Sequence, residues 1–208
     1  MVAPPKTEHE AKQNASLLVT ADEFLILCET HPDYKDGSFE LIHGEIVEKV
    51  TTLEHGIIGT RLIYFLQSYL MKTNKGYLGM EVTSRNPNNT TNVRKPDISY
   101  FLDTSHLNIK DTATPRMPEL AVEIISPSQP RREMREKADY YLRNGSKLVW
   151  IIYPDTRTVE VCTWTGESLA IATLDDKATL TGGDILPDFT LPLSEIFPPQ
   201  TESSPKSE

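Results

Sequence analysis

Apolar residues recur along this chain at two spacings, which alternate from one segment to the next. From about Glu54 to Gly76 they stand three or four positions apart, as on one face of an amphipathic helix. A second segment with this spacing runs from Arg132 to Arg143 and ends at Asn144-Gly145, a typical C-terminal cap. Thr20 and Glu23 form a capping-box pattern that predicts the start of a shorter helix.

Segments rich in β-branched and aromatic residues lie between the predicted helices. Ser38 to Val50 predicts a hairpin that turns at His43-Gly44. Glu119 to Ser126 is nearly continuous in apolar residues, as expected of a strand buried on both faces. The remaining predicted strands are Tyr77–Arg85, Val93–Leu102, Lys147–Tyr153 and a hairpin over residues 157–174. This order of elements predicts an α/β domain.

The length and composition predict one domain with a sizeable core. The chain has 208 residues, 38% of them apolar, and it contains no internal repeat or long linker. We expect a single domain over residues 17–197, between flexible tails at 1–16 and 198–208. No apolar run has the roughly 18–20 residues of a membrane span and no leader is evident, so we expect a cytoplasmic protein without a membrane partner. Cys28 and Cys162 lack the spacing of a disulfide framework or zinc site.

The charge of the chain limits how it could bind a polyanion. With 21 basic and 30 acidic residues, the net charge is −9, and ten acidic against three basic residues fall within 155–208. The chain is therefore not a basic nucleic-acid wrapper, and a nucleic acid would need a local patch. The predicted helix near residue 132 offers one, with Arg131, Arg132, Arg135 and Lys137 beside two glutamates. Such a helix is ordinarily a solvated face, but it could contact a phosphate backbone.

Two acidic residues stand where local structure does not explain them. Asp97 lies in a β-prone segment, although aspartate is a poor strand former. Glu123 interrupts an apolar strand, and alternation places it on the same face as Ala121 and Ile125. A buried, unpaired carboxylate is costly unless a cation or hydrogen bonds compensate it. If the two strands are neighbours, both carboxylates can converge on a hard cation such as Mg²⁺.

Lys137 is the third candidate for chemistry. It lies on the helix that follows the Glu123 strand, with Tyr141 one turn later on the same helix face. If this helix folds over the sheet, the ammonium could orient or deprotonate a metal-bound water and counter the charge on a phosphate. All three charged residues also have structural explanations as ion pairs or turn caps. The alternative partners are Arg94 or Lys95 for Asp97, Arg116 or Arg85 for Glu123, and Glu133 for Lys137.

Several motifs in a fixed order resemble the Uma2 family. They are FELIHGEIVEK, then RKPDISYF, ELAVEIISPS, the helix with Lys137 and Tyr141, and VWIIYPDTRTVEV. The resemblance extends over roughly Thr20 to Trp164. Because Uma2 proteins are grouped with the PD-(D/E)XK nucleases, it implies a restriction-endonuclease-like core, a mixed sheet flanked by helices. It also implies cleavage of DNA phosphodiester bonds with Mg²⁺, for which Mn²⁺ would be a substitute.

The resemblance assigns the catalytic set residue by residue. Pro96-Asp97 fills the PD position and Glu123 the (D/E) position. The superfamily lysine would stand two residues after Glu123, where this chain has Ile125. The resemblance therefore moves this role to Lys137 on the following helix.

Two further assignments depend on the same resemblance. Glu45, in the GEIVEK segment, resembles an acidic position that would support a second metal, and Glu40 competes with it for that role. His55, near the start of the long helix, is a candidate substrate-binding residue, although a lone histidine there more often caps or packs. Arg131, Arg132 and Arg135 are the other candidates for binding the substrate.

The expected function is that of a Mg²⁺-dependent DNA endonuclease whose catalytic residues are Asp97, Glu123 and Lys137. One alternative is a DNA-binding module that keeps the fold without cleaving. Another is a self-associating regulatory or toxin-associated protein in which the carboxylates are structural. A homodimer would suit cleavage of both strands by two-fold symmetry.

Overall fold

The computed structural model of the chain describes residues 18–105, 107–126 and 129–199, and it contains three sheets. The predicted tail at 1–16 lies outside these residues, as does the predicted tail at 198–208 except for residues 198 and 199. In chain order, the elements are α2 (Ala21–Thr30), α3 (Pro32–Lys35), β1 (Phe39–Ile42), β2 (Glu45–Glu48), α4 (Leu53–Thr73), β3 (Tyr77–Met80), β4 (Ser84–Arg85), β5 (Val93–Arg94), β6 (Ile98–Phe101), β7 (Leu120–Ile124), α5 (Arg131–Arg143), β8 (Leu148–Tyr153), β9 (Thr158–Trp164), β10 (Leu169–Asp175), β11 (Thr179–Gly182), β12 (Leu186–Pro192) and the 3₁₀ helix η1 (Leu193–Glu195).

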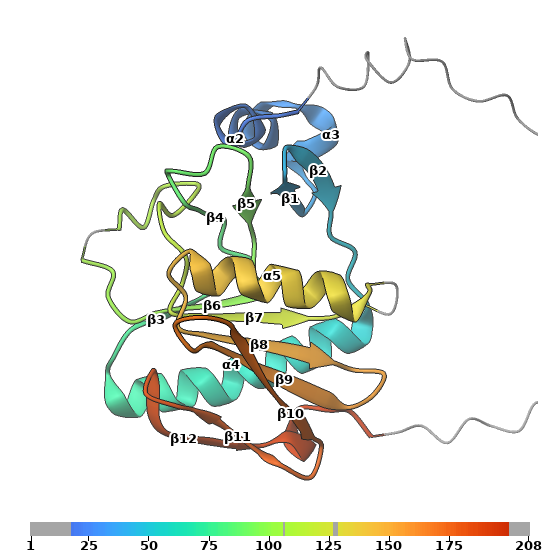
Figure 1. Ribbon diagram of the computed structural model, residues 1–208, viewed down its shortest axis with the longest axis vertical. Coiled ribbons are helices and arrows are strands. Elements are labelled where there is room, and N and C mark those ends of the chain that lie inside the picture. The colour runs from blue at the N-terminus through green and yellow to red at the C-terminus, as the bar shows by residue number, and fades with distance from the viewer. Residues whose placement is uncertain (1–17, 106, 127–128, 200–208) are drawn as a thin grey trace, which may run out of the picture.

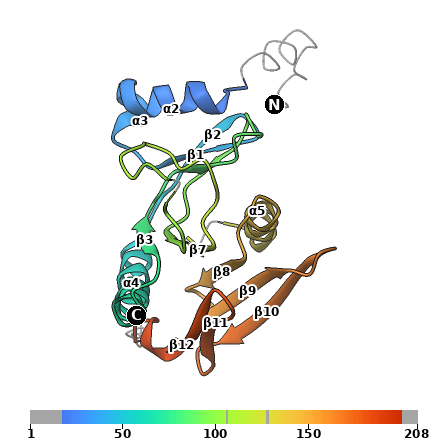
Figure 2. The same cartoon turned by 90° about the vertical axis from the view of Figure 1, so that its left-hand side faces the viewer.

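The largest sheet has six strands in the order β10-β9-β8-β7-β6-β3, and helices cover both of its faces (Figures 1 and 2). Only β7 and β8 pair in parallel, through the crossover helix α5. Helix α4 packs on the face that carries Leu120, Val122 and Ile124. Helix α5 packs on the opposite face, with Ala121 and Ile125. The expected mixed sheet flanked by helices is therefore confirmed.

A smaller sheet, in the order β2-β1-β5-β4, forms a second layer with α2 and α3 (Figure 2). Its core holds Phe24, Leu41 and Val93, all buried. The predicted capping box of α2 is present, with Thr20 and Glu23 bonded in both directions. The β1–β2 hairpin turns at His43-Gly44, whose φ angles of 52° and 84° are those of a type I′ turn.

The chain crosses between the two sheets at two points where the sequence predicted continuous strands. Val93–Leu102 is divided into β5 and β6, which belong to different sheets, and Asp97 stands in the break. Tyr77–Arg85 is likewise divided into β3 and β4, with Glu81 at φ 48° between them. The Glu81 N–H donates to the Asp97 carbonyl at 3.2 Å, so the two crossings lie side by side. A sheet crossing explains why aspartate is tolerated in this β-prone segment.

The C-terminal hairpin of β11 and β12 was not predicted from the pattern. Pro187 and Pro192 interrupt β12, and proline is a poor signal for a strand. The hairpin closes the core beneath α4, where Phe189 stacks on Trp150 with ring centroids 5.9 Å apart. The Tyr69 hydroxyl donates to the Pro187 carbonyl at 2.7 Å. None of the helices in the described ranges is long and apolar enough to cross a membrane.

Candidate active site

Five charged side chains from different segments meet where the small sheet, α5 and the carboxyl end of β7 come together. We call them the acid–lysine cluster, and they are Glu40 of β1, Lys49 after β2, Asp97 before β6, Glu123 of β7 and Lys137 of α5. All five are nearly buried, between 3% and 9% exposed. The fold thus concentrates ionised groups from a sequence span of almost a hundred residues in one place.

Lys137 joins two of the carboxylates. Its Nζ lies 2.8 Å from Glu40 Oε2 and 2.9 Å from Glu123 Oε1. The Tyr141 hydroxyl, one turn later on α5, donates to Glu123 Oε1 at 2.6 Å. The partners of Lys137 are therefore across the fold and not at Glu133, which is exposed.

Asp97 is held on both of its carboxylate oxygens. Oδ1 accepts from Lys49 Nζ at 2.7 Å, and Oδ2 accepts from the Ile124 N–H of β7 at 2.6 Å. His55 Nε2, from the first turn of α4, lies 3.5 Å from Oδ1. The bond to Ile124 follows from the pairing of β6 with β7, in which Ile98 is opposite Val122. The predicted proximity of Asp97 and Glu123 on neighbouring strands is thus observed.

Lys49 was missed by the sequence analysis. Its Nζ also donates to the Lys95 carbonyl at 2.7 Å, so the ammonium is bound inside the protein. The residue ends the GEIVEK segment, where a lysine normally extends into solvent. The sequence shows only a lysine close to the end of the predicted hairpin. Its partner, Asp97, lies 48 residues later in the chain, so local pattern does not reveal the pair.

The structure brings Glu40, and not Glu45, into the cluster. Glu40 is 3% exposed, and its Oε1 accepts from the Lys95 N–H at 2.7 Å. Glu45 is exposed on the edge strand β2, opposite Ile42. Glu40 lies on β1, which has neighbours on both sides, so its side chain is covered where that of Glu45 is not.

Burial and like charges act together on the acids of the cluster. Burial is the largest influence on Glu123 and raises its pKa. The Lys137 and Lys49 ammoniums act to lower that pKa and the Asp97 and Glu40 carboxylates act to raise it, and the net shift is upward. Burial also acts to raise the pKa of Glu40, but the Lys137 and Lys49 ammoniums outweigh it and hold that pKa below its ordinary value. Burial acts to lower the pKa of Lys49, but the surrounding carboxylates, led by Glu123, raise it above its ordinary value.

The donor set fits a magnesium ion in type. Mg²⁺ is commonly bound by one or two carboxylates, waters and substrate phosphates, and Asp97 and Glu123 supply two buried carboxylates. Over the ranges that the structure describes, no three His, Cys, Asp or Glu side chains form a ready ion-binding group. The ammoniums of Lys49 and Lys137 instead neutralise the carboxylates. The Arg94 guanidinium also acts on Glu40, so the three carboxylates face three cations within the described residues.

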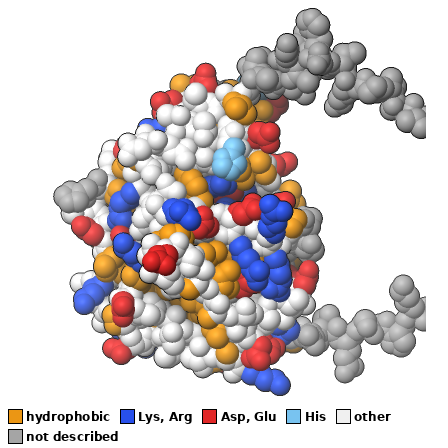
Figure 3. Space-filling view, in the orientation of Figure 1, with side chains coloured by type: hydrophobic (Ala, Val, Ile, Leu, Met, Phe, Trp, Pro, Cys, Tyr) orange, Lys and Arg blue, Asp and Glu red, His pale blue; other side chains and the backbone are white. Residues whose placement is uncertain are grey.

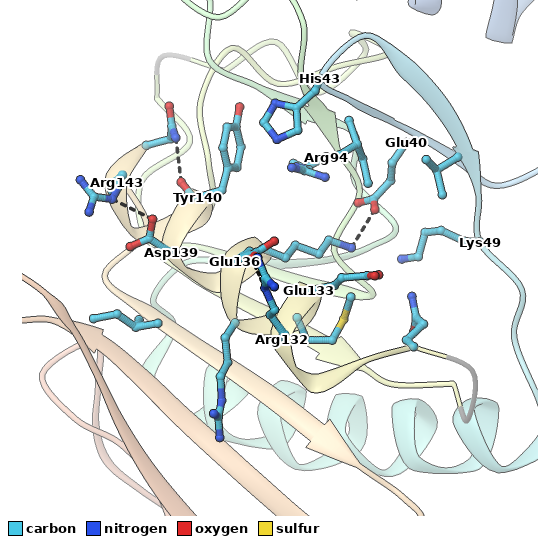
Figure 4. Close-up of a pocket in the computed structure, with 18 of the residues that line it drawn as sticks. Glu40, His43, Lys49, Arg94, Arg132, Glu133, Glu136, Asp139, Tyr140 and Arg143 are labelled. Carbon is cyan, nitrogen blue, oxygen red and sulfur yellow. Dashed lines mark hydrogen bonds and ion pairs between the residues drawn. The ribbon is translucent and has the colours of Figure 1, made fainter. Parts of the chain in front are cut away.

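A groove of about 910 Å³ opens onto this cluster between α5 and the β1–β2 hairpin (Figure 4). Glu40, Lys49 and Lys137 line it, and so do Arg94 and Tyr140. Figure 3 shows basic and acidic side chains gathered on this face of the molecule. The groove therefore reaches three members of the cluster, Glu40, Lys49 and Lys137, from solvent, while Asp97 and Glu123 lie behind its lining.

The arginines at the start of α5 have partners within the protein. Arg131 and Arg135 both bind Glu160 of β9, at 3.1 and 2.6 Å, and Glu160 is fully buried. Arg132 is exposed and pairs with Glu136 at 2.9 Å. Two of the three predicted substrate-binding arginines thus neutralise a buried carboxylate, whose location the basic pattern alone did not reveal. Arg132 and Arg135 still line the groove.

The structural alternatives for the three catalytic candidates do not match the observed partners. Asp97 pairs with Lys49, and Glu123 pairs with Lys137. The arginines considered for Glu123 pair elsewhere, Arg116 with Glu119 and Arg85 with Asp22.

Fold and site together define a nuclease-like α/β domain, in which carboxylates from neighbouring strands meet a lysine from the crossover helix. The chain belongs to the Uma2 family, because the family model described as "Putative restriction endonuclease" matches residues 21–194. This confirms the resemblance seen in the sequence.

A solved structure shares the fold. The crystal structure of a "putative nuclease belonging to DUF820" from Anabaena variabilis ATCC 29413 superposes with a TM-score of 0.72 and 23% sequence identity. The match covers 86% of this chain and 97% of that chain. The search of curated proteins found no match.

Proposed function

We propose that the protein is a Mg²⁺-dependent endonuclease that hydrolyses phosphodiester bonds in DNA at the acid–lysine cluster. The observation that carries the proposal is the meeting of Asp97 and Glu123 on neighbouring strands with Lys137, which lines a groove open to solvent. Buried carboxylates beside a lysine are costly for the stability of a fold, and such groups are typical of catalytic sites. The nuclease description of the family supports the same reaction class.

In this proposal, the residues of the chain position the reacting groups before the substrate binds. Tyr141 donates to Glu123, and the Ile124 N–H donates to Asp97, so both carboxylates have fixed orientations. The Lys137 ammonium orients the attacking water and counters the negative charge that develops on the phosphate. Glu40 holds Lys137 from the other side.

Asp97 and Glu123 would hold the metal, with Glu40 in the supporting role that the sequence analysis gave to Glu45. When bound, Mg²⁺ polarises a phosphate oxygen and lowers the pKa of a water, and Mn²⁺ would substitute for it. His55 stays a candidate for contact with the substrate, since its Nε2 lies beside Asp97. Its buried Nδ1 has no hydrogen-bond partner among the described atoms.

The test is nicking of supercoiled plasmid DNA by the purified full chain. We expect nicking with Mg²⁺ or Mn²⁺, none with EDTA, and none with Asp97→Asn or Glu123→Gln. Glu45→Gln is the matched control, because it removes an exposed carboxylate of the neighbouring strand, and it should cleave like the wild type.

Two results would contradict the proposal. One is the absence of metal-dependent cleavage, and the other is cleavage that persists in both acid variants. Binding without cleavage would identify a DNA-binding protein that retains the fold. Linear product formed directly, before nicked circles accumulate, would support the homodimer, because two copies related by a two-fold axis cut both strands.

A further inference from the structure

Arg94 is a buried cation that forms no close ion pair within the described structure, although the Glu40 carboxylate acts on it electrostatically. It lies on β5 and is 4% exposed. Its one hydrogen bond runs from Nη2 to the Asn92 side chain at 3.3 Å, and its buried Nε has no partner among the described atoms. No carboxylate of the described residues forms an ion pair with it, unlike Lys49 and Lys137 close by. A buried guanidinium in this state is costly for the fold unless an anion joins it.

Arg94 faces the same groove as the acid–lysine cluster. Leu41 of β1 is opposite Val93 of β5, so the antiparallel register places Glu40 opposite Arg94. Figure 4 shows the guanidinium between the Glu40 carboxylate and the ring of Tyr140, which lies 4.7 Å from Arg94 Cζ. Tyr140 also lines the groove, and its buried hydroxyl has no hydrogen-bond partner in the described ranges. Two donor groups without hydrogen-bond partners among the described atoms, Arg94 Nε and the Tyr140 hydroxyl, therefore lie on one groove, next to Glu40 of the acid–lysine cluster.

From this arrangement we infer that Arg94 and Tyr140 form a phosphate-binding subsite for a nucleic acid strand lying in the groove. The fork of a guanidinium matches the two non-bridging oxygens of a backbone phosphate, and a tyrosine hydroxyl can donate to one of them. Stacking on Tyr140 fixes the plane of the fork, which lowers the entropic cost of binding. The subsite holds a backbone phosphate adjacent to the one that is cleaved, so Arg94 is a binding residue and not a catalytic one.

This inference rests on the proposed function for the identity of the ligand, but its test does not need cleavage. The probe is a fluorescein-labelled single-stranded DNA oligonucleotide, titrated with the full chain in EDTA and followed by fluorescence anisotropy over a series of salt concentrations. Arg94→Met should weaken binding by about tenfold or more and reduce the salt slope by about one, since one phosphate contact is lost. Tyr140→Phe should weaken binding by a smaller factor, and Arg94→Lys should fall between the wild type and Arg94→Met.

The control is Arg157→Met, which removes a partly buried arginine that is paired with Asp176 and does not line the groove. It should leave the oligonucleotide affinity and the salt slope close to those of the wild type. Thermal unfolding separates a structural role from a binding role. Arg94→Met should still unfold in one cooperative transition, so that weaker binding reports the lost phosphate contact and not a loss of the fold.

The outcomes distinguish this inference from the proposed function. Unchanged affinity and salt slope in both Arg94 variants would overturn the subsite, whether or not the wild type cleaves DNA. Equal competition by inorganic phosphate and by unlabelled oligonucleotide at matched phosphate concentration would also overturn it, because the site would then bind a free anion and not a strand. Arg94-dependent binding by a protein that does not cleave plasmid DNA would support the subsite while refuting the nuclease.

Discussion

Replacing Lys137 with methionine tests whether the acid–lysine cluster is held together by its ammoniums. The change keeps most of the side-chain volume and removes a charge that lies 2.8 Å from Glu40 and 2.9 Å from Glu123. All three side chains are at most 6% exposed, so solvent screens these ion pairs little. Removing one partner of a buried ion pair typically costs about 3–5 kcal/mol. Two carboxylates lose their partner here, so we expect a loss near the upper end of that range.

The assay is urea unfolding of the full chain at neutral pH with EDTA, followed by circular dichroism. The free energy of unfolding should fall while the dependence on urea concentration stays the same. Lys147→Met is the control for net charge, because Lys147 is exposed, and its effect should stay within about 0.5 kcal/mol.

A double variant isolates the cause of the loss. Adding Glu123→Gln to Lys137→Met removes one of the two unpaired carboxylates, so the double variant should be more stable than Lys137→Met alone. A loss below about 1 kcal/mol for Lys137→Met, or strict additivity in the double variant, would refute the reasoning.

Three further predictions concern the same cluster. Because the pKa of Glu123 is raised, the folded protein holds the proton of this carboxyl more tightly than the unfolded chain does. Relative to Glu123→Gln, the wild type should therefore lose stability as pH rises from 4.5, the ordinary pKa of a glutamate, through the folded pKa of Glu123. The lowered pKa of Glu40 gives the opposite dependence of stability on pH. Relative to Glu40→Gln, the wild type should keep its extra stability above pH 4.5 and lose it as pH falls through the folded pKa of Glu40. Urea unfolding across the acid range measures both, and parallel profiles for the two variants would contradict them. Lys49→Met leaves Asp97 without its ammonium, so it should lower the melting temperature in EDTA. Added Mn²⁺ should then raise the melting temperature of this variant more than that of the wild type. An equal rise in both proteins would argue against Asp97 as a metal ligand.

The parts of the fold that follow from local pattern could be predicted from the sequence. The helices α2, α4 and α5 and the β1–β2 hairpin depend on periodicity, caps and a turn dipeptide, all of which act within a few residues. The breaks in two predicted strands were not found this way. Pro96 and Asp97 both disfavour a strand, but local pattern does not tell a short irregularity within one strand from a crossing between two sheets. Only the pairing of β5 with β1 and of β6 with β7 decides between them.

The same distinction separates the site residues that were foreseen from those that were missed. Asp97 and Glu123 conflict with their own local surroundings, so a sequence pattern can reveal them. Lys49 and Arg94 conflict with nothing nearby, since a lysine after a hairpin and an arginine in a short strand are usually solvated. Their roles come from partners that stand far away in the chain, such as Asp97 for Lys49.

The two kinds of buried cation in this site indicate how its charge is divided between stability and binding. Lys49 and Lys137 each have a carboxylate within 2.9 Å, so their charge is used within the fold and contributes little net attraction for a polyanion. The same holds for Arg131 and Arg135, which neutralise Glu160. Arg94 forms no close ion pair within the described residues, so more of its charge acts on the groove, although Glu40 offsets part of it. A chain with a net charge of −9 can therefore attract a phosphate locally without a broad basic surface, and its affinity for nucleic acid should depend on few contacts and fall only modestly with salt.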